Sequence, residues 1–165
     1  MIRLVNGRGQ LGSALKKLDL SNQQGFIYHT WNVSDKSEST QKFEYEKFIK
    51  FVSNVAMPYD KIIFISTNSQ NDTWYTWYKQ KAESYLLLNH KDSIVLRLPT
   101  FIGTPCKLFE PDADVWGKVE LISIESAASK ILECIKTIKD NKNRIFNIKG
   151  ETISAQLVAD ILKIK

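Results

Sequence analysis

Apolar residues in this chain fall into two alternating patterns, short continuous runs and longer stretches with helical spacing. The continuous runs are IRLVN, FIYHTW, KIIFIS, SIVLRL and RIFNI. Runs of this length suit strands that are buried on both faces of a parallel sheet. Strands that alternate with helices predict an α/β domain, here a Rossmann-like parallel sheet of about five strands with flanking helices.

The stretches between these runs carry apolar side chains three or four positions apart, which is the spacing of one helix face. Helices are predicted from about Leu11 to Leu18, from about Thr40 to Ala56, from Asp72 to about Asn89, around Ile124 to Ile138 and from near Ser154 onward. Asp72 is the expected N-cap of the third helix. Residues 99–117 are rich in prolines and glycines, and we expect them to form a loop.

The length of 165 residues fits one domain, which we expect to span residues 1–165. Apolar residues make up 43% and charged residues 25% of the chain, as is ordinary for a soluble globular protein. The formal net charge is +5, but the lysines are scattered and do not form one basic run. We therefore expect no nucleic acid as a partner, and only a mild attraction for anionic small molecules.

Several kinds of segment are absent from the sequence. No apolar run approaches the length of about 18 residues that marks a membrane-spanning helix. The N-terminus, MIRLVNG, reads as a strand and not as a secretory signal. Cys106 and Cys134 lack the spacing of metal ligands, and we expect both to be free thiols in a reducing compartment. These features predict a cytoplasmic protein with no membrane contact and no metal site.

A glycine-rich loop lies between the first strand and the first helix. Its residues are Asn6, Gly7, Gly9, Gln10, Leu11 and Gly12. Glycines in this position let a pyrophosphate approach the backbone, and the free N–H groups at the helix start bind it. The sequence therefore predicts that this loop binds a dinucleotide, although a plain turn between strand and helix is the alternative.

A second candidate site follows the third strand. KIIFIS ends in the hydroxyl pair Ser66–Thr67, and a short turn leads to a helix that carries Tyr75 and Lys79. Side chains four apart on a helix share one face, so Lys79 is expected to lower the pKa of the Tyr75 phenol. Such a set could move a proton on or off a carbinol or carbonyl. The alternative is an ordinary pair on a helix surface.

These motifs resemble those of the extended short-chain dehydrogenase/reductases, a family of nucleotide-sugar epimerases, dehydratases and reductases. NGRGQLGSALKKL resembles the family's glycine loop, and is most similar to that of dTDP-4-dehydrorhamnose reductases. IIFIST resembles the strand that delivers the catalytic hydroxyl, and Tyr75, Lys79, Glu83 and Leu86 match the pattern Y-x-x-x-K-x-x-x-E-x-x-L. IVLRLPTFIGT, which contains Pro99, resembles the strand and loop that approach the nicotinamide.

The resemblance implies NAD(P)-dependent oxidation–reduction or epimerisation of a nucleotide-linked sugar. It assigns acid–base catalysis to Tyr75 and the catalytic hydroxyl to Thr67. Lys79 would lower the pKa of the tyrosine and hold a ribose of NAD or NADP. Pro99 would lie beside the nicotinamide, and the glycine loop would hold the pyrophosphate.

The sequence also departs from the family. Members usually have about twice this length, with a separate region for the substrate. The acidic residue that holds the adenosine ribose is expected about 20 residues beyond the glycine loop, and none is found there. FIYHTWNVSD looks more like the family's fourth strand than its second, so two strands would be lost before it. A flavodoxin-like order, with FIYHTW on the other side of the first strand, is the competing arrangement.

Two further expectations follow. The aromatic-rich helix from Trp74 to Leu88 carries Trp77, Tyr78 and Tyr85, and such enrichment favours a homodimer through this helix. The missing length and the missing acid suggest the alternative function, a non-catalytic relative that serves as a dinucleotide-binding or dimeric interaction module.

Overall fold

The computed structural model describes residues 2–5, 9–18, 25–54, 61–102, 117–137 and 144–163. In chain order its elements are β1 (Ile2–Val5), α1 (Gly9–Leu15), β2 (Gly25–Tyr28), α2 (Glu38–Asn54), β3 (Lys61–Thr67), α3 (Trp74–Asn89), β4 (Ser93–Leu98), β5 (Thr100–Ile102), β6 (Lys118–Ser123), α4 (Ile124–Thr137), β7 (Ile145–Asn147), β8 (Glu151–Ser154) and α5 (Ala155–Lys163). Within the described ranges, no helix is long and apolar enough to cross a membrane.

The main sheet has five strands in the order β1-β2-β3-β4-β7, and every neighbouring pair is parallel. The predicted parallel sheet with flanking helices is therefore confirmed. Strand β2 lies between β1 and β3, so the flavodoxin-like order is wrong and the shortened order is correct. Each strand is added on the same side of the one before it.

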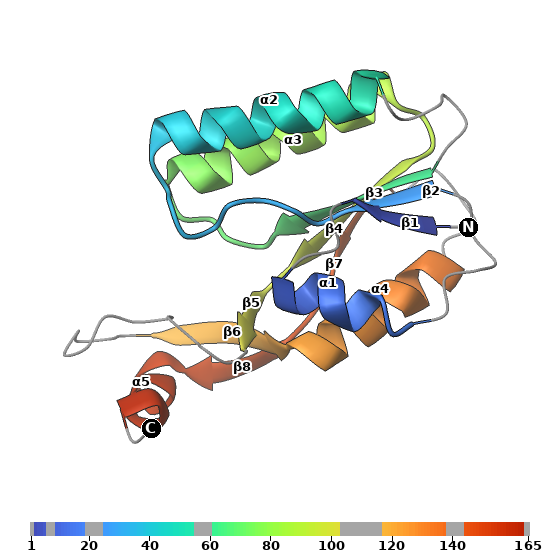
Figure 1. Ribbon diagram of the computed structural model, residues 1–165. Helices are drawn as coiled ribbons and strands as arrows, with labels where there is room; N and C mark the ends of the chain where they lie inside the picture. The colour runs from blue at the N-terminus through green and yellow to red at the C-terminus, as the bar shows by residue number, and fades with distance from the viewer. Residues whose placement is uncertain are drawn as a thin grey trace.

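Both faces of this sheet are buried, because successive side chains of a strand point to opposite faces. Ile63 and Ile65 of β3 belong to one core cluster, while Ile62 and Phe64 belong to the other. Helices α2 and α3 cover the face of Phe64, and α1 and α4 cover the face of Ile65 (Figure 1). The continuous apolar runs in the sequence reflect this double cover.

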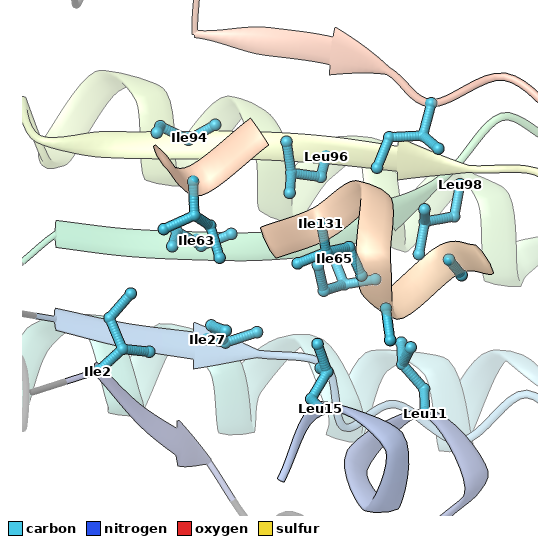
Figure 2. Close-up of a cluster of buried hydrophobic side chains, with 14 of the residues drawn as sticks. Ile2, Leu11, Leu15, Ile27, Ile63, Ile65, Ile94, Leu96, Leu98 and Ile131 are labelled. Atoms are coloured by element: carbon cyan, nitrogen blue, oxygen red, sulfur yellow. The ribbon is translucent and has the colours of Figure 1, made fainter. Parts of the chain in front are cut away.

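The connection through α1 has an unusual hand. The steps from β1 to β2 and from β2 to β3 run in the same direction across the sheet, yet α1 and α2 lie on opposite faces. The two crossovers must therefore have opposite hands, although parallel crossovers are right-handed in about 98% of cases. Leu11 and Leu15 of α1 are buried against the sheet beside Ile131 of α4 (Figure 2). This burial stabilises the exceptional connection.

A second sheet was not expected from the sequence. It has the order β5-β6-β8, with β5 parallel and β8 antiparallel to β6. Residues 100–102, predicted as loop, form β5, whereas residues 103–116 of the same predicted loop lie outside the described residues. The segments TFI, KVELIS and ETIS do not form continuous apolar runs like those of the main sheet, so the sequence reading missed them.

Helix α3 is fastened at both ends. Its N-cap is Thr73, whose side chain accepts a hydrogen bond from the backbone N–H of Thr76, so the prediction of Asp72 as the cap was wrong by one residue. At the other end, Arg144 donates to the backbone carbonyls of Leu87 and His90. Capping of this kind satisfies the backbone groups that a helix leaves without partners at its ends.

Strand β2 begins at a position that tolerates only glycine. Gly25 has φ 140°, and a Cβ there would lie 2.1 Å from the carbonyl oxygen of Lys61 in β3. We expect Gly25→Ala to lower the free energy of unfolding by about 3 kcal/mol or more, measured by chemical denaturation. Gly117→Ala is the matched control, because its φ is 86° but a Cβ would meet nothing within 4 Å. Equal losses in the two variants would refute the proposed close approach.

Candidate functional site

Three parallel strands of the main sheet end close together, and the candidate catalytic hydroxyl lies on one of these ends. Thr67 is the last residue of β3, and its side-chain oxygen accepts a hydrogen bond of 3.0 Å from the backbone N–H of Ser69. The backbone N–H of Asn68 donates to the carbonyl of Leu98 at the end of β4. These bonds hold the turn that leads into α3.

The turn brings Tyr75 back to Thr67. Tyr75 lies in the first turn of α3, and its hydroxyl forms a hydrogen bond with the side chain of Thr67. Burial raises the pKa of Tyr75 to about 12, and the bond to Thr67 offsets only part of this effect. The expected lowering of this pKa by Lys79 was therefore wrong. Tyr75 is protonated at neutral pH and can donate a proton or a hydrogen bond.

Lys79 is bound to the strand beneath it. Its side-chain amine donates a hydrogen bond of 2.7 Å to the backbone carbonyl of Ile65, and the residue is only 3% exposed. The nitrogen lies 4.6 Å from the ring centroid of Trp31 and 4.7 Å from that of Phe64. We call this surrounding, formed by Trp31, Phe64 and the Ile65 carbonyl, the Lys79 cage.

The protonation of Lys79 follows from this burial. Desolvation lowers the pKa of Lys79 to about 7, against an opposing effect of the nearby carboxylates of Glu83 and Glu44. The amine therefore exchanges its proton near neutral pH. Its contacts are with β3 and the cage, so this conformation offers no amine to a ribose.

Glu83, the acidic residue of the Y-x-x-x-K-x-x-x-E pattern, is paired with an arginine on the sheet. Arg97 of β4 donates to both carboxylate oxygens of Glu83, at 2.6 Å from Nη2 and 3.1 and 3.2 Å from Nε. Glu83 is 3% exposed, and the pair raises the pKa of the Arg97 guanidinium. The bidentate contact connects α3 to β4.

A polar pocket of about 240 Å³ lies beside these strand ends. It is lined by Asn68, Gln70, Arg97, Glu120, Asn147 and Lys149. Asn68 donates to the carbonyl of Ile148, and Glu120 accepts from the backbone N–H of Gly150. Sequence reasoning did not single out these residues as a site. Polar side chains at the carboxyl ends of parallel strands were the signal that could have found Asn68 and Asn147.

The glycine loop is only partly described. Asn6 and Gly7 lie outside the described residues, whereas Gly9 and Gln10 are exposed at the start of α1. Gly9 has φ 83°, and a Cβ there would meet nothing within 4 Å. Leu11 and Gly12 are buried, and the side chain of Leu11 belongs to the core. The dinucleotide-binding role of this loop stays a prediction.

Pro99 lies away from the surface. It is buried between β4 and β5, and a Cβ added to Gly150 would come within 3.1 Å of its ring. The structure thus brings Thr67 and Tyr75 together and places Pro99 at the junction of the two sheets. The Lys79 amine is hydrogen-bonded to the carbonyl of Ile65.

NAD or NADP fits the described residues only in part. The connections after β1 and β2 lead to opposite faces, which is the arrangement at which α/β sheets bind nucleotides. However, β1 is the edge of the described sheet, so no described strand lies where the adenosine ribose would be held. Lys79 is committed to its cage. The described residues therefore do not make a complete dinucleotide site.

Comparisons with known proteins agree with this fold. The sequence matches no protein-family model and no curated protein. A dTDP-4-dehydrorhamnose reductase from Bacillus anthracis, solved with NADP, is similar with a TM-score of 0.74 and 13% identity, over 98% of this chain and 78% of that one. The corresponding reductase from Clostridium acetobutylicum gives a TM-score of 0.72 at 14% identity, over the same shares of the two chains.

An epimerase shares the fold as well. UDP-N-acetylglucosamine 4-epimerase from Bacillus cereus gives a TM-score of 0.62 at 15% identity, over 98% of this chain and 83% of that one. At such identities the similarity shows the fold and does not transfer activity. The fold expected from the resemblance is thereby confirmed, in a chain shorter than these relatives.

Among the residues that the structure describes, no three His, Cys, Asp or Glu side chains lie close enough together to hold a metal ion. Cys134 is a partly buried free thiol, while Cys106 lies outside the described residues.

The Lys79 cage predicts how stability depends on pH. Lys79 has a pKa of about 7 when folded, against a value of 10.5 in the absence of burial. Between these values the unfolded chain holds a proton that the folded chain has lost, so the free energy of unfolding rises with pH. From about pH 7 to 9 we expect Lys79 to add at most about 1.4 kcal/mol per pH unit.

Denaturant unfolding of Lys79→Met across this pH range is the test. The variant should lack the rise, whereas Lys81→Met, which removes an exposed lysine of the same helix, should keep it. A rise of equal slope in both variants would show that Lys79 is not the group responsible.

Proposed function

We propose that this protein is an enzyme of the sugar-nucleotide reductase and epimerase type that its structural neighbours represent. Thr67 and Tyr75 would be its acid–base pair. The observation that carries the proposal is the hydrogen bond between these two side chains at the carboxyl end of β3, beside a polar pocket. Candidate ligand sites of α/β sheets lie at this edge.

The protonated state of Tyr75 favours one role in particular. A phenol with a pKa of about 12 keeps its proton at neutral pH, so it serves as a donor to a substrate oxygen. A carbonyl oxygen that gains negative charge during reduction is such an acceptor. Thr67, bound to Tyr75 and to the N–H of Ser69, would orient the donor.

The pocket supports a substrate rich in hydroxyl groups. Its lining combines amides, two cations and one carboxylate, so it offers both donors and acceptors. A sugar hydroxyl is donor and acceptor at once, whereas a purely anionic ligand would be repelled by Glu120. Lys149 would favour the phosphates of a nucleotide-linked sugar, whereas the charge of Arg97 is balanced by Glu83.

NAD or NADP is the expected redox partner, with the glycine loop from Asn6 to Gly12 as its site. Because the described residues fit a dinucleotide only in part, no step of the reaction is assigned to it. We place the activity in the cytoplasm, in line with the free thiol of Cys134.

A second candidate is a non-catalytic relative that serves as a dimeric interaction module. It is favoured by the Lys79 cage, which withholds the lysine from a ligand. The exposed side chains of α3 support it too: Trp74 is 45%, Trp77 47% and Leu88 85% exposed. Tyr78 is 5% exposed and lies near Tyr45 of α2, so only part of the predicted dimer face is available.

Substitution of Tyr75 separates the two candidates. For the enzyme, Tyr75→Phe should lower turnover of a keto-sugar nucleotide by about 10²–10⁴-fold, because the proton donor is lost. Tyr85→Phe is the control, since its hydroxyl contacts Ser53 of α2 and lies outside the site. Turnover is followed as NADPH absorbance, and folding is checked by circular dichroism. Equal turnover in wild type and Tyr75→Phe would remove the tyrosine from the mechanism.

Ligand binding gives a further prediction. A ligand that binds only the folded state raises the unfolding temperature, so NAD, NADP, their reduced forms and nucleotide sugars can be compared by thermal shift. The enzyme should be stabilised by at least one dinucleotide and one sugar nucleotide. A concentration-dependent dimer with no response to any of these compounds would favour the interaction module.

A further inference from the structure

The Lys79 cage depends on a side chain from a separate segment. Phe64 belongs to the strand beneath Lys79, but Trp31 comes from the connection between β2 and α2. Its ring lies 4.6 Å from the lysine nitrogen and 5.9 Å from the ring of Phe64. Trp31 therefore closes the side of the cage that β3 does not provide.

Trp31 is held in place by one buried amide. Its indole N–H donates a hydrogen bond of 2.7 Å to Oε1 of Gln41, which is 0% exposed in the first turns of α2. Nε2 of Gln41 donates to the backbone carbonyls of Asn32 and Asp35. One side chain thus satisfies the tryptophan and two carbonyls of the same connection. A buried amide with all these partners fixes the segment strongly.

The two carboxylates that face Lys79, those of Glu83 and Glu44, are ion-paired with other residues. Glu83, on the same helix, is committed to Arg97, and Glu44 of α2 forms an ion pair of 3.1 Å with Lys47. Neither carboxylate has a hydrogen bond to the lysine amine among the described interactions, which are those with Ile65 and the two rings. The direct contacts of the amine are thus the Ile65 carbonyl and the two rings, while the two carboxylates act on its charge through space.

We propose that Gln41 and Trp31 are positioning residues for Lys79: Gln41 fixes the indole, and the indole holds the lysine amine against β3. A ligand that uses Lys79, such as a ribose of the NAD or NADP expected under the proposed function, must first draw the amine from beneath Trp31. The orientation of Trp31 then sets how readily such a ligand binds. In the absence of a ligand, Lys79 is a structural residue.

Acylation of lysines followed by mass spectrometry tests the cage directly. In the wild type, acetic anhydride should modify Lys79 at least about ten-fold more slowly than exposed Lys81, because a buried amine reacts only after local opening. Trp31→Leu should raise the Lys79 rate toward or beyond that of Lys81. Trp31→Phe, which keeps an aromatic face, should retain most of the protection. Equal rates for Lys79 and Lys81 in the wild type, or continued protection in Trp31→Leu, would overturn the proposal.

The role of Gln41 is tested in the same way. Gln41→Leu removes the anchor but leaves Trp31 intact, and it should expose Lys79 to acylation. A circular dichroism spectrum like that of the wild type shows that the fold is retained. If Trp31→Leu does not fold, the acylation rate of Lys79 in Gln41→Leu tests the proposal by itself. A protected Lys79 in folded Gln41→Leu contradicts the positioning role of the glutamine.

Titration with NADPH separates this inference from the proposed function. If both hold, Trp31→Leu binds NADPH more tightly than the wild type, since the ligand no longer displaces the indole. If no variant binds NADPH while the acylation pattern is as expected, the cage stands and the proposed cofactor is wrong. If NADPH binds but acylation of Lys79 is fast in the wild type, the positioning role is wrong.

Discussion

The need to cover both faces of one parallel sheet governs this structure. Strands β1 to β4 are added in a single direction, and right-handed crossovers alone would place every helix on one face. The chain solves this by sending α1 to the opposite face, where Leu11 and Leu15 join α4 over Ile27, Ile63 and Ile65. A crossover of exceptional hand is therefore tolerated, because α1 together with α4 buries a sheet face rich in isoleucine and leucine.

The same crossover gives this five-stranded sheet one feature of nucleotide-binding α/β folds. Since α1 and α2 leave the carboxyl ends of neighbouring strands toward opposite faces, the point between β1 and β2 has the geometry at which larger relatives of this fold bind ligands. The side of β1 away from β2 carries no described strand. Within the described sheet this arrangement therefore has strands on the β2 side of β1 only.

The strand runs and the helices were predictable from the sequence because apolar period and β-propensity report burial directly, whereas the strand order was inferred from the resemblance of FIYHTWNVSD to a later strand of the family. The pairing of Thr67 with Tyr75 was accessible as well, since a strand end and the first turn of the next helix must lie close together. The direction in which the Lys79 side chain points could not be predicted from the sequence. Helical spacing shows which face a side chain occupies, but it does not show whether an amine reaches outward or is held by a strand carbonyl. Arg97, Glu120 and Lys149 are far apart in the sequence and line one pocket only because the two sheets pack together. A local sequence pattern therefore could not identify them as one site.

The contact of Glu83 with Arg97 has a mechanical consequence. Glu83 joins α3 to Arg97 of β4, and Arg144, the residue before β7, donates both to the carbonyl of Leu87 in α3 and to that of Ser93 in β4. Two attachments along one helix oppose its sliding over the sheet, and this keeps Tyr75, in the first turn of α3, near the end of β3.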